Sequence, residues 1–329
     1  MKIAVCQGEA VGGSPSRDML IQYWDKELKK IPDVEQIDYY EVFNESMIGD
    51  HDAVVGAWIR DGFFNKEFFE KYPKLKYIAT LGHGFGKVDV EAAKENHVTI
   101  TNTIYGDVTI AQYAFALLMN ICHHVDREDL YYKDKLKDGN GFQPGHKKVC
   151  TRQIELFEKT IGIVGLGNIG LWMAKMAQGF GMKVISYSRH KKQGEEYSFI
   201  EQVSLKEVLE RSDVISIHCP LTDETRGMID RAAIESMKDG VIIINTARGA
   251  IIDEEAMVEA LHSGKIYAAG LDVVDGEPVR DWKPIFGCEN ASVTAHIAWA
   301  PEEARYRTVR LAAQNLKNWM EGHPTSMIY

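Results

Sequence analysis

A glycine-rich turn, Gly165-Leu-Gly167-Asn-Ile-Gly170, is the feature that most restricts how this chain can fold. It follows a β-type run, TIGIVG, and opens a stretch with the apolar spacing of a helix, after which a second β-type run, KVISYS, arrives within about thirty residues. This order predicts a parallel βαβ unit that binds a dinucleotide, whereas a turn that only packs tightly is the alternative. Gly165 would permit the tight turn, Gly167 the approach of a pyrophosphate, and Gly170 the close packing of helix on strand. The N-terminus of the helix would offer N–H groups to the phosphates.

The second strand of this unit ends in Tyr187-Ser188-Arg189, without the acidic residue that usually binds the adenosine ribose of NAD. A Ser hydroxyl and an Arg guanidinium suit a 2′-phosphate, because the first can donate a hydrogen bond and the second a charged one. Lys191 and Lys192 follow, and they either add positive charge to this site or only face solvent. The sequence therefore favours NADP(H), and NAD(H) bound without its usual carboxylate is the alternative.

Short apolar runs alternate with amphipathic stretches over most of the chain, which predicts parallel sheets covered by helices on both faces. The rhythm changes near Ile104: one long helical pattern covers 107–134, and a loop rich in Gly and Lys covers 135–148. A second alternating series follows, with one helix opened by a capping box at Ser204 and Glu207.

The chain is therefore predicted to form two doubly wound α/β domains, the second inserted into the first. Residues 1–103 and 298–329, which include a closing helix with Pro301 near its first turn, would form one domain, and residues 104–297 the other. The cleft between two such domains is where a ligand is expected.

Charge and cysteine content narrow the function classes. The net charge is −10, from 38 basic and 48 acidic side chains, so the chain lacks the basic footprint of a nucleic-acid-binding protein. Five cysteines, an odd number without a C-x-x-C pair, argue against a disulfide framework or zinc site and predict a cytoplasmic protein. Cys122, His123 and His124 point in different directions from one helix, so no metal site is predicted there. No signal peptide is evident, and no run approaches the ~18–20 apolar residues of a membrane span.

Three polar residues stand directly after strand-like runs late in the chain. Arg248 follows GVIIINT, Glu277 follows the run ending LDVV, and His296 follows NASVTA. Ligands of open α/β sheets bind beyond the carboxyl ends of the strands, so these side chains are expected in one crevice. An Arg can hold a carboxylate and polarise the adjacent carbonyl, a His can deliver a proton, and a neighbouring Glu favours the imidazolium. Singly they read as a surface Arg, a turn Glu and a core His; together they predict carbonyl reduction beside a bound nicotinamide.

Five stretches carry a resemblance to a known family: GIVGLGNIG, SDVISIHCPLTDETRGMI, MKDGVIIINTARGAIIDEEAMVEAL, AAGLDVVDGEP and TAHIAWAPEEAR. Over nearly its whole length the chain resembles the D-isomer-specific 2-hydroxyacid dehydrogenases, and HIAWA is most similar to their glycerate dehydrogenase and hydroxypyruvate (glyoxylate) reductase branch. The resemblance implies a Rossmann cofactor domain inserted into a flavodoxin-like substrate domain. It also implies a homodimer, with the helix near 107–125 as its surface, that reduces a small 2-oxo acid, hydroxypyruvate or glyoxylate first, to the D-2-hydroxy acid. A D-lactate or 3-phosphoglycerate dehydrogenase is one alternative, and a corepressor-like dinucleotide sensor is an alternative of another class.

The resemblance assigns substrate binding to Arg248, acid–base chemistry to His296 and tuning of that His to Glu277. The expected cofactor contacts, including those read from the glycine turn and the second strand, are Gly165, Gly167, Asn168, Ile169, Gly170, Ser188, Arg189, Cys219, Pro220, Thr225, Thr246, Ala247, Arg248, Asp272, His296 and Ala298. The expected substrate contacts are Gly82, His83, Gly84, Arg248 and His296. His83 replaces a small hydroxyl residue of the family and Lys87 adds a charge, so His83 is either a substrate contact or a surface residue.

Overall fold

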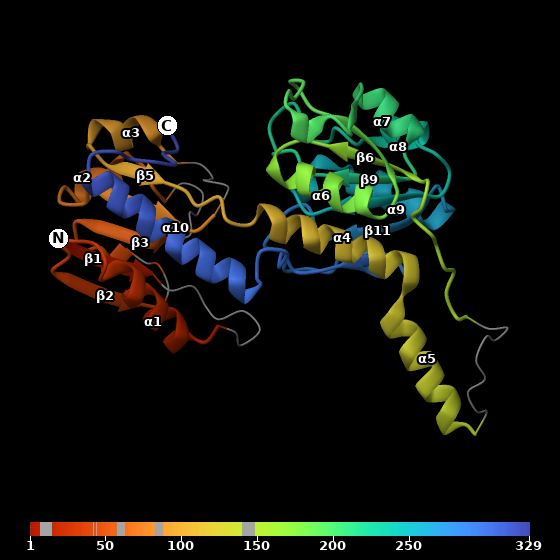
Figure 1. Ribbon diagram of the computed structural model, residues 1–329, viewed down its shortest axis with the longest axis horizontal. Coiled ribbons are helices and arrows are strands. Elements are labelled where there is room, and N and C mark those ends of the chain that lie inside the picture. The colour runs from red at the N-terminus through yellow and green to blue at the C-terminus, as the bar shows by residue number, and fades with distance from the viewer. Residues whose placement is uncertain (7–14, 42, 44, 58–62, 83–87, 140–148) are drawn as a thin grey trace. The chain divides into compact units, whose positions relative to one another are not determined.

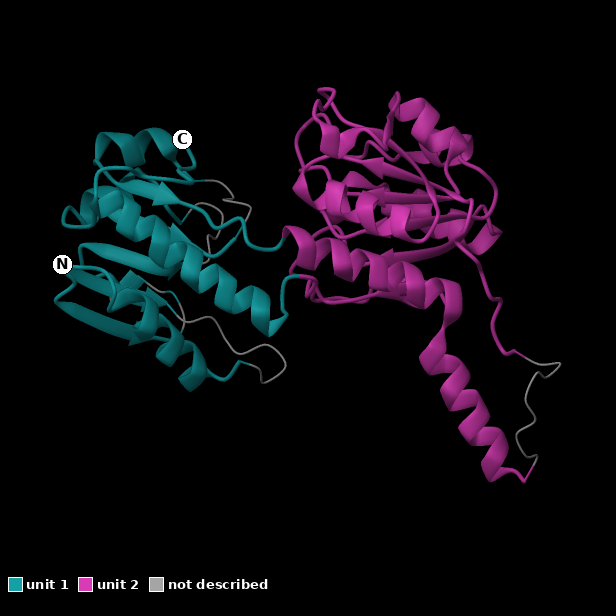
Figure 2. Ribbon diagram, viewed as in Figure 1, with its two compact units in different colours: residues 1–106, 299–329 teal, residues 107–298 magenta. Residues whose placement is uncertain are grey.

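The computed structural model describes every residue except 7–14, 42, 44, 58–62, 83–87 and 140–148 (Figure 1). It divides into two compact units, of which the first contains Met1–Gly106 and Trp299–Tyr329 and the second contains Asp107–Ala298 (Figure 2). Both units are parallel sheets covered by helices, so the predicted α/β class is confirmed.

The first unit contains a five-stranded sheet in the order β2 (Gln36–Tyr40), β1 (Lys2–Cys6), β3 (Ala53–Ala57), β4 (Tyr77–Thr80) and β5 (Thr99–Thr101). This is the flavodoxin-like strand order. One face packs against α1 (Arg17–Leu28) and α10 (Glu302–Met320), and the other against α2 (Lys66–Lys71) and α3 (Val90–Glu95). α10 thus returns from the far end of the sequence to complete this unit.

The second unit contains a seven-stranded sheet in the order β12 (Ala291–Val293), β11 (Ile266–Leu271), β10 (Val241–Asn245), β9 (Val214–Ile217), β6 (Thr160–Val164), β7 (Lys183–Tyr187) and β8 (Glu201–Gln202). Its first six strands in chain order have the arrangement of a Rossmann sheet. The chain adds β7 and β8 on one side of β6 and then crosses to add β9 and the following strands on the other side. One face packs against α4 (Asp107–His123) and α6 (Asn168–Gly179), and the other against α7 (Leu205–Arg211), α8 (Arg231–Ser236) and α9 (Glu254–Ser263). The capping box at Ser204 and Glu207 opens α7 as predicted.

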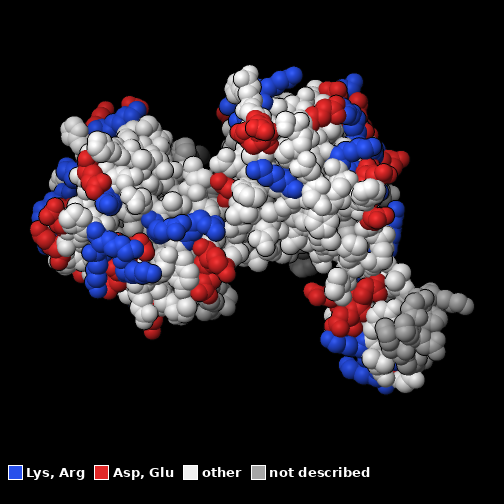
Figure 3. Space-filling view, in the orientation of Figure 1, with Lys and Arg blue, Asp and Glu red and all other residues white. Residues whose placement is uncertain are grey.

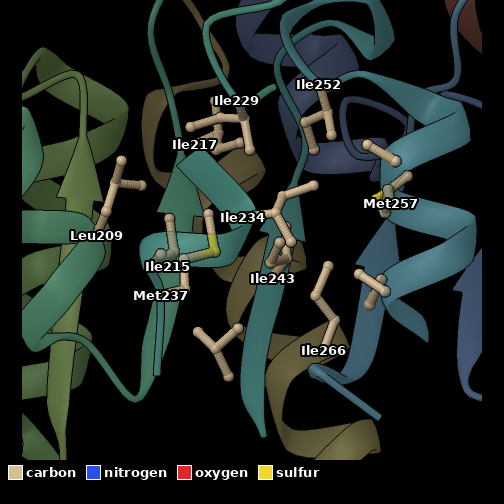
Figure 4. Packing of buried hydrophobic residues seen from close by; sticks show 14 of the residues in the cluster. Leu209, Ile215, Ile217, Ile229, Ile234, Met237, Ile243, Ile252, Met257 and Ile266 are labelled. Atoms are coloured by element: carbon tan, nitrogen blue, oxygen red, sulfur yellow. The ribbon is translucent and has the colours of Figure 1, made fainter. Parts of the chain in front are cut away.

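β-branched residues fill the core of the second unit. Ile215 of β9 and Ile243 of β10 pack with Ile234 of α8 and Met257 of α9 (Figure 4). Such side chains suit strands that are buried on both faces, and full burial of each contributes about 1.5–3 kcal/mol. This core fixes the sheet from which the polar loops emerge.

The last residues of six neighbouring strands lie in one row across this sheet: Val293, Leu271, Asn245, Ile217, Val164 and Tyr187. Because all the strands are parallel, the residues that follow them begin at the same edge. The loops that carry the predicted catalytic residues and the glycine turn therefore all begin at this edge of the sheet.

The prediction of one long helix over 107–134 is wrong, because the structure has two helices there, α4 and α5 (Val125–Lys137). His124 separates them with a left-handed backbone, φ 44°. α4 buries eight residues against the sheet and α6, whereas α5 buries none, because the apolar spacing stops after Cys122. The two-residue strand β8 is a second element that the sequence pattern did not indicate.

The helical stretch Asp107–Lys137 is long and apolar enough to cross a membrane by length and composition alone, which the sequence analysis did not anticipate. A helix buried in a protein core meets the same criterion. In this protein 44% of the apolar window is buried, and α4 packs on β10 and β11.

Candidate active site

Glu277 and His296 form the central pair of the site. Nδ1 of His296 lies 2.8 Å from Oε2 of Glu277, and Oε1 of Glu277 accepts a hydrogen bond of 2.9 Å from the backbone N–H of Val274. Burial raises the pKa of Glu277, but the hydrogen bonds from His296 and Val274 and the charges of His296 and Arg248 outweigh burial and leave that pKa below its usual value. An ionised carboxylate can only accept, so Nδ1 of His296 is the donor.

Asp272 holds the loop that carries His296. Its carboxylate is fully buried and accepts hydrogen bonds from the Thr294 hydroxyl and from the backbone N–H groups of Ile297 and Ala298, at 2.7, 2.9 and 2.8 Å. The N–H of His296 itself donates to the backbone oxygen of Asp272 at 2.8 Å. His296 has φ 54°, a left-handed conformation that costs a non-glycine residue about 1–2 kcal/mol. The bonds to Asp272 fix the loop in that conformation.

Arg248 lies on the turn after β10, with its side chain exposed and Nη1 bonded to the oxygen of Ala247 at 2.6 Å. Asn245 closes this turn: its side chain accepts from the N–H of Ala247 and donates to the oxygen of Arg248, at 2.9 and 3.0 Å. A Cβ at Gly249 would lie 1.9 Å from the backbone carbon of Val274, so only glycine allows this turn to lie against the one that leads to Glu277. The positive charge of Arg248 is close enough to Glu277 to lower the pKa of that carboxyl group.

The glycine turn leaves room for a phosphate group in one place. Gly165 has φ 99°, and a Cβ on it would meet the backbone of Cys219 at 2.5 Å; a Cβ on Gly170 would lie 2.3 Å from the oxygen of Gly165. A Cβ on Gly167 would meet nothing within 4 Å, although Gly167 is the N-cap of α6 and supplies no side chain to cap it. The space over Gly167 and the N–H groups at the start of α6 therefore fit a dinucleotide pyrophosphate.

Other predicted cofactor residues surround the same edge of the sheet. The side chain of Asn168 donates to Asp107 at 3.1 Å, Ile169 packs partly into the core, and the hydroxyl of Thr225 donates to the oxygen of Pro220 at 2.7 Å. Cys219 is partly buried, and burial raises the pKa of its thiol to about 11. The hydroxyl of Thr246 is buried and has no hydrogen-bond partner among the described residues.

His218 lies beneath the glycine turn and was not selected from the sequence. Its Nε2 lies 2.8 Å from the hydroxyl of Ser216, and its Nδ1 is buried without a partner in the described part of the chain. Burial lowers the pKa of His218 to about 4. The imidazole is therefore neutral near pH 7, and the backbone of His218 lies against the turn, since a Cβ on Gly165 would meet the backbone carbon of His218 at 2.7 Å.

The end of β7 carries the predicted 2′-phosphate residues on the surface. The hydroxyl of Ser188 donates to the oxygen of His190 at 2.8 Å, and Nη1 of Arg189 lies 3.4 Å from Oε2 of Glu224. Lys191 and Lys192 are exposed. The backbone of Lys192 is bonded twice to the side chain of Gln202, at 2.7 and 2.8 Å.

The predicted substrate loop belongs to the first unit. Gly82 follows β4 and its oxygen accepts a hydrogen bond of 3.3 Å from the N–H of Thr103. His83 and Gly84 lie outside the described residues. Their substrate contacts stay a prediction.

Sequence reasoning missed three contributors to the site: the clamp made by the Asp272 carboxylate, the close packing at Gly249, and His218 under the glycine turn. Each has a signal in the sequence. Asp272 and His218 are polar residues at the ends of apolar strands, and Gly249 is a glycine directly beside a predicted catalytic Arg. The sequence does not show which residues Asp272, Gly249 and His218 contact, and those contacts determine their roles.

Comparison with known proteins places the chain in a family. The family described as "D-isomer specific 2-hydroxyacid dehydrogenase, NAD binding domain" matches residues 115–298. A hydroxypyruvate reductase of Blautia hydrogenotrophica is 40% identical over 86% of each chain, and a glyoxylate reductase of Thermococcus litoralis is 39% identical over 78% of each. The structure of an acyclic imino acid reductase in complex with NADPH and D-Arg aligns over 100% of both chains with a TM-score of 0.80 and 27% identity. The matched domain, the shared fold and the identity to the two reductases show that the chain belongs to the D-isomer-specific 2-hydroxyacid dehydrogenases and is an oxidoreductase that uses a nicotinamide dinucleotide.

Proposed function

We propose that this protein reduces a small 2-oxo acid, hydroxypyruvate or glyoxylate, to the D-2-hydroxy acid. The observation that carries the proposal is the 2.8 Å bond between Glu277 and His296, with the charge of Arg248 close enough to lower the pKa of that Glu. An acid–base group and a cation at one sheet edge provide what carbonyl reduction requires of a protein. The names of the similar reductases support the choice of substrate.

In this proposal Arg248 binds the substrate carboxylate and orients the adjacent carbonyl. The bound cofactor, held along Gly165–Gly170 and by Thr246 and Ala247, supplies the hydride. Since Nδ1 of His296 donates to Glu277, Nε2 is the nitrogen that delivers the proton to the carbonyl oxygen. Ionised Glu277 favours the imidazolium that this step consumes.

NADPH is the cofactor that we propose. β7 ends without a carboxylate, and Arg189 extends from that end with 71% of its side chain exposed. A 2′-phosphate would bind Arg189 and the hydroxyl of Ser188 once that hydroxyl leaves the oxygen of His190. Substrate contacts at Gly82, His83 and Gly84 and a cytoplasmic location are further predictions that await their own tests.

The direct test is kcat/KM for hydroxypyruvate and glyoxylate with each cofactor, with pyruvate and 3-phosphohydroxypyruvate as comparison substrates. We expect turnover of the first two acids and a preference for NADPH that Ser188→Asp with Arg189→Ala reverses. A folded protein that binds cofactor but turns over neither acid would refute the reaction. A strong NADH preference in the unmutated protein would refute the cofactor assignment alone.

A homodimer is the assembly that we propose, with α5 as its contact instead of the helix near 107–125. α5 buries no residue of its own, and Val125, Leu130 and Leu136 are 69, 66 and 52% exposed. Leu130 and Leu136 line one hollow together with Tyr131, and a contiguous exposed apolar patch marks an interaction surface. Acidic residues in the first turn of α5 and basic residues in the last, seen on the face in Figure 3, favour an antiparallel pairing of two copies. Leu130→Glu should convert the dimer to a monomer in light scattering, whereas Lys206→Glu, on the exposed surface of α7, should not.

A further inference from the structure

The guanidinium of Arg189, on which the preference for NADPH depends, already has an anionic partner. Oε2 of Glu224 lies 3.4 Å from Nη1 of Arg189, and the two side chains are 74 and 71% exposed. A 2′-phosphate and Glu224 would therefore meet at one cation. Exposed ion pairs of this kind are weak, so either anion can displace the other.

The sheet order explains why these two residues meet. Arg189 follows β7 and Glu224 lies in the loop after β9, and β7 and β9 are the two neighbours of β6. Parallel neighbours are about 4.8 Å apart, so the side chains span about 10 Å across the end of β6, where the glycine turn begins. The ion pair thus crosses the adenosine end of the dinucleotide site.

Both backbones that carry the pair are fixed by hydrogen bonds. On the Glu224 side, the hydroxyl of Thr225 accepts from the N–H of Thr222 at 2.8 Å and donates to the oxygen of Pro220. On the Arg189 side, the segment that follows is bonded to Gln202 through Lys192. These bonds hold the two segments beside Arg189 and Glu224, so the Glu224 carboxylate lies within reach of a phosphate that Arg189 binds.

We propose that Glu224 is a specificity-determining residue that competes with the 2′-phosphate for Arg189 and so limits the preference for NADPH over NADH. This inference rests on the proposed use of Arg189 for the 2′-phosphate. NADH carries no charge at that position, so its binding leaves the ion pair intact. Removing the carboxylate frees Arg189 for the phosphate and also removes a like charge beside it.

The test measures the Kd of NADPH and of NADH by fluorescence titration of the full chain, without substrate and at low salt. Glu224→Gln should tighten NADPH binding about three- to tenfold and leave NADH within about twofold, an effect that shrinks at high salt. Asp223→Asn is the matched control, because it removes the same charge from the adjacent exposed residue. In an Arg189→Ala background, Glu224→Gln should tighten NADPH binding clearly less than it does in the unmutated protein, because only the like-charge repulsion is then left to remove.

The outcomes separate this inference from the proposed cofactor. If Arg189→Ala leaves NADPH binding unchanged, the assignment of Arg189 to the 2′-phosphate is wrong. If Arg189→Ala weakens NADPH binding but Glu224→Gln behaves like Asp223→Asn, only the role of Glu224 is wrong. A loss of NADH affinity in Glu224→Gln with NADPH unchanged also overturns it, because Glu224 would then bind the ribose hydroxyl instead.

Discussion

The catalytic end of the second unit, at Glu277 and His296, and its adenosine end, at Ser188 and Arg189, begin from the same edge of one sheet but are held differently. At the catalytic end a fully buried carboxylate, Asp272, fixes the loop of His296 through three hydrogen bonds. At the adenosine end the side chains of Arg189 and Glu224 are exposed and form an ion pair of 3.4 Å. Buried, satisfied polar networks are rigid and costly to break, whereas exposed pairs are weak and easily exchanged.

The difference separates two properties of the enzyme. The proposed reaction requires a proton donor at a fixed position, and the buried bonds to Asp272 would hold His296 there. The choice between NADPH and NADH requires only a modest difference in binding energy, which exposed charges can supply. Mutations at the catalytic end should therefore change rate and stability together, and mutations at the adenosine end should change cofactor preference alone.

Replacement of His296 should have the largest effect. His296→Asn removes the proposed proton donor, so kcat for reduction should fall by about 10²–10⁴ while the Kd of NADPH stays the same. Steady-state kinetics and a cofactor titration on the same sample measure the two quantities. A kcat within tenfold of the unmutated protein would show that another group delivers the proton.

Replacement of Asp272 tests the clamp. In the unmutated protein the carboxylate accepts hydrogen bonds from the N–H groups of Ile297 and Ala298. In Asp272→Asn the amide NH₂ replaces one acceptor oxygen and faces an N–H donor, so the unfolding free energy should fall by about 2–3 kcal/mol. The loop of His296 should loosen, and kcat should fall about tenfold or more. Urea denaturation and kcat on one preparation test both. Thr294→Val is the control, since it removes one bond and leaves the two that hold Ile297 and Ala298; equal losses in both variants would argue against the clamp.

His218 shows that the adenosine end also has a rigid part, beneath the glycine turn. Its pKa in the folded protein is about 4, below the 6.5 of an unperturbed imidazole, so between these values the unfolded chain binds a proton that the folded protein does not. The unfolding free energy should therefore fall by about 2 kcal/mol as the pH drops from about 6.5 to about 4. His218→Gln should reduce this pH dependence in urea denaturation, whereas His323→Gln, at an exposed position, should leave it unchanged.

The sequence could predict the parts of the site that depend on local patterns, but not those that depend on contacts between distant loops. Strand ends and the glycine turn are local patterns, so Gly165, Arg248, Glu277 and His296 could be placed at one sheet edge from the sequence. The partners of Asp272 and Gly249 are set by contacts between loops that are more than twenty residues apart, which no periodicity records. The ion pair of Arg189 depends on strand order, because Glu224 reaches it only from the other side of β6.

Replacement of Glu277 by Gln should have the smallest effect on the reaction. Comparison with Glu277→Ala separates the contribution of the negative charge from that of the side-chain geometry at the catalytic end. In Glu277→Gln the amide oxygen can still accept from the N–H of Val274, so the loop geometry should persist, while the negative charge and the acceptor for Nδ1 of His296 are lost because the amide NH₂ takes the place of Oε2. The pKa of Glu277 lies below its usual value, so the carboxylate is ionised throughout a neutral assay, and its replacement removes a negative charge beside His296. Since the His296 and Glu277 side chains are 41 and 31% exposed, solvent screens the pair, and kcat of Glu277→Gln should fall by about tenfold or less. Glu277→Ala loses both charge and orientation, so its kcat should be lower than that of Glu277→Gln. A kcat of Glu277→Gln equal to that of the unmutated protein would mean that the charge of Glu277 is not needed, and charge would then matter at the adenosine end alone.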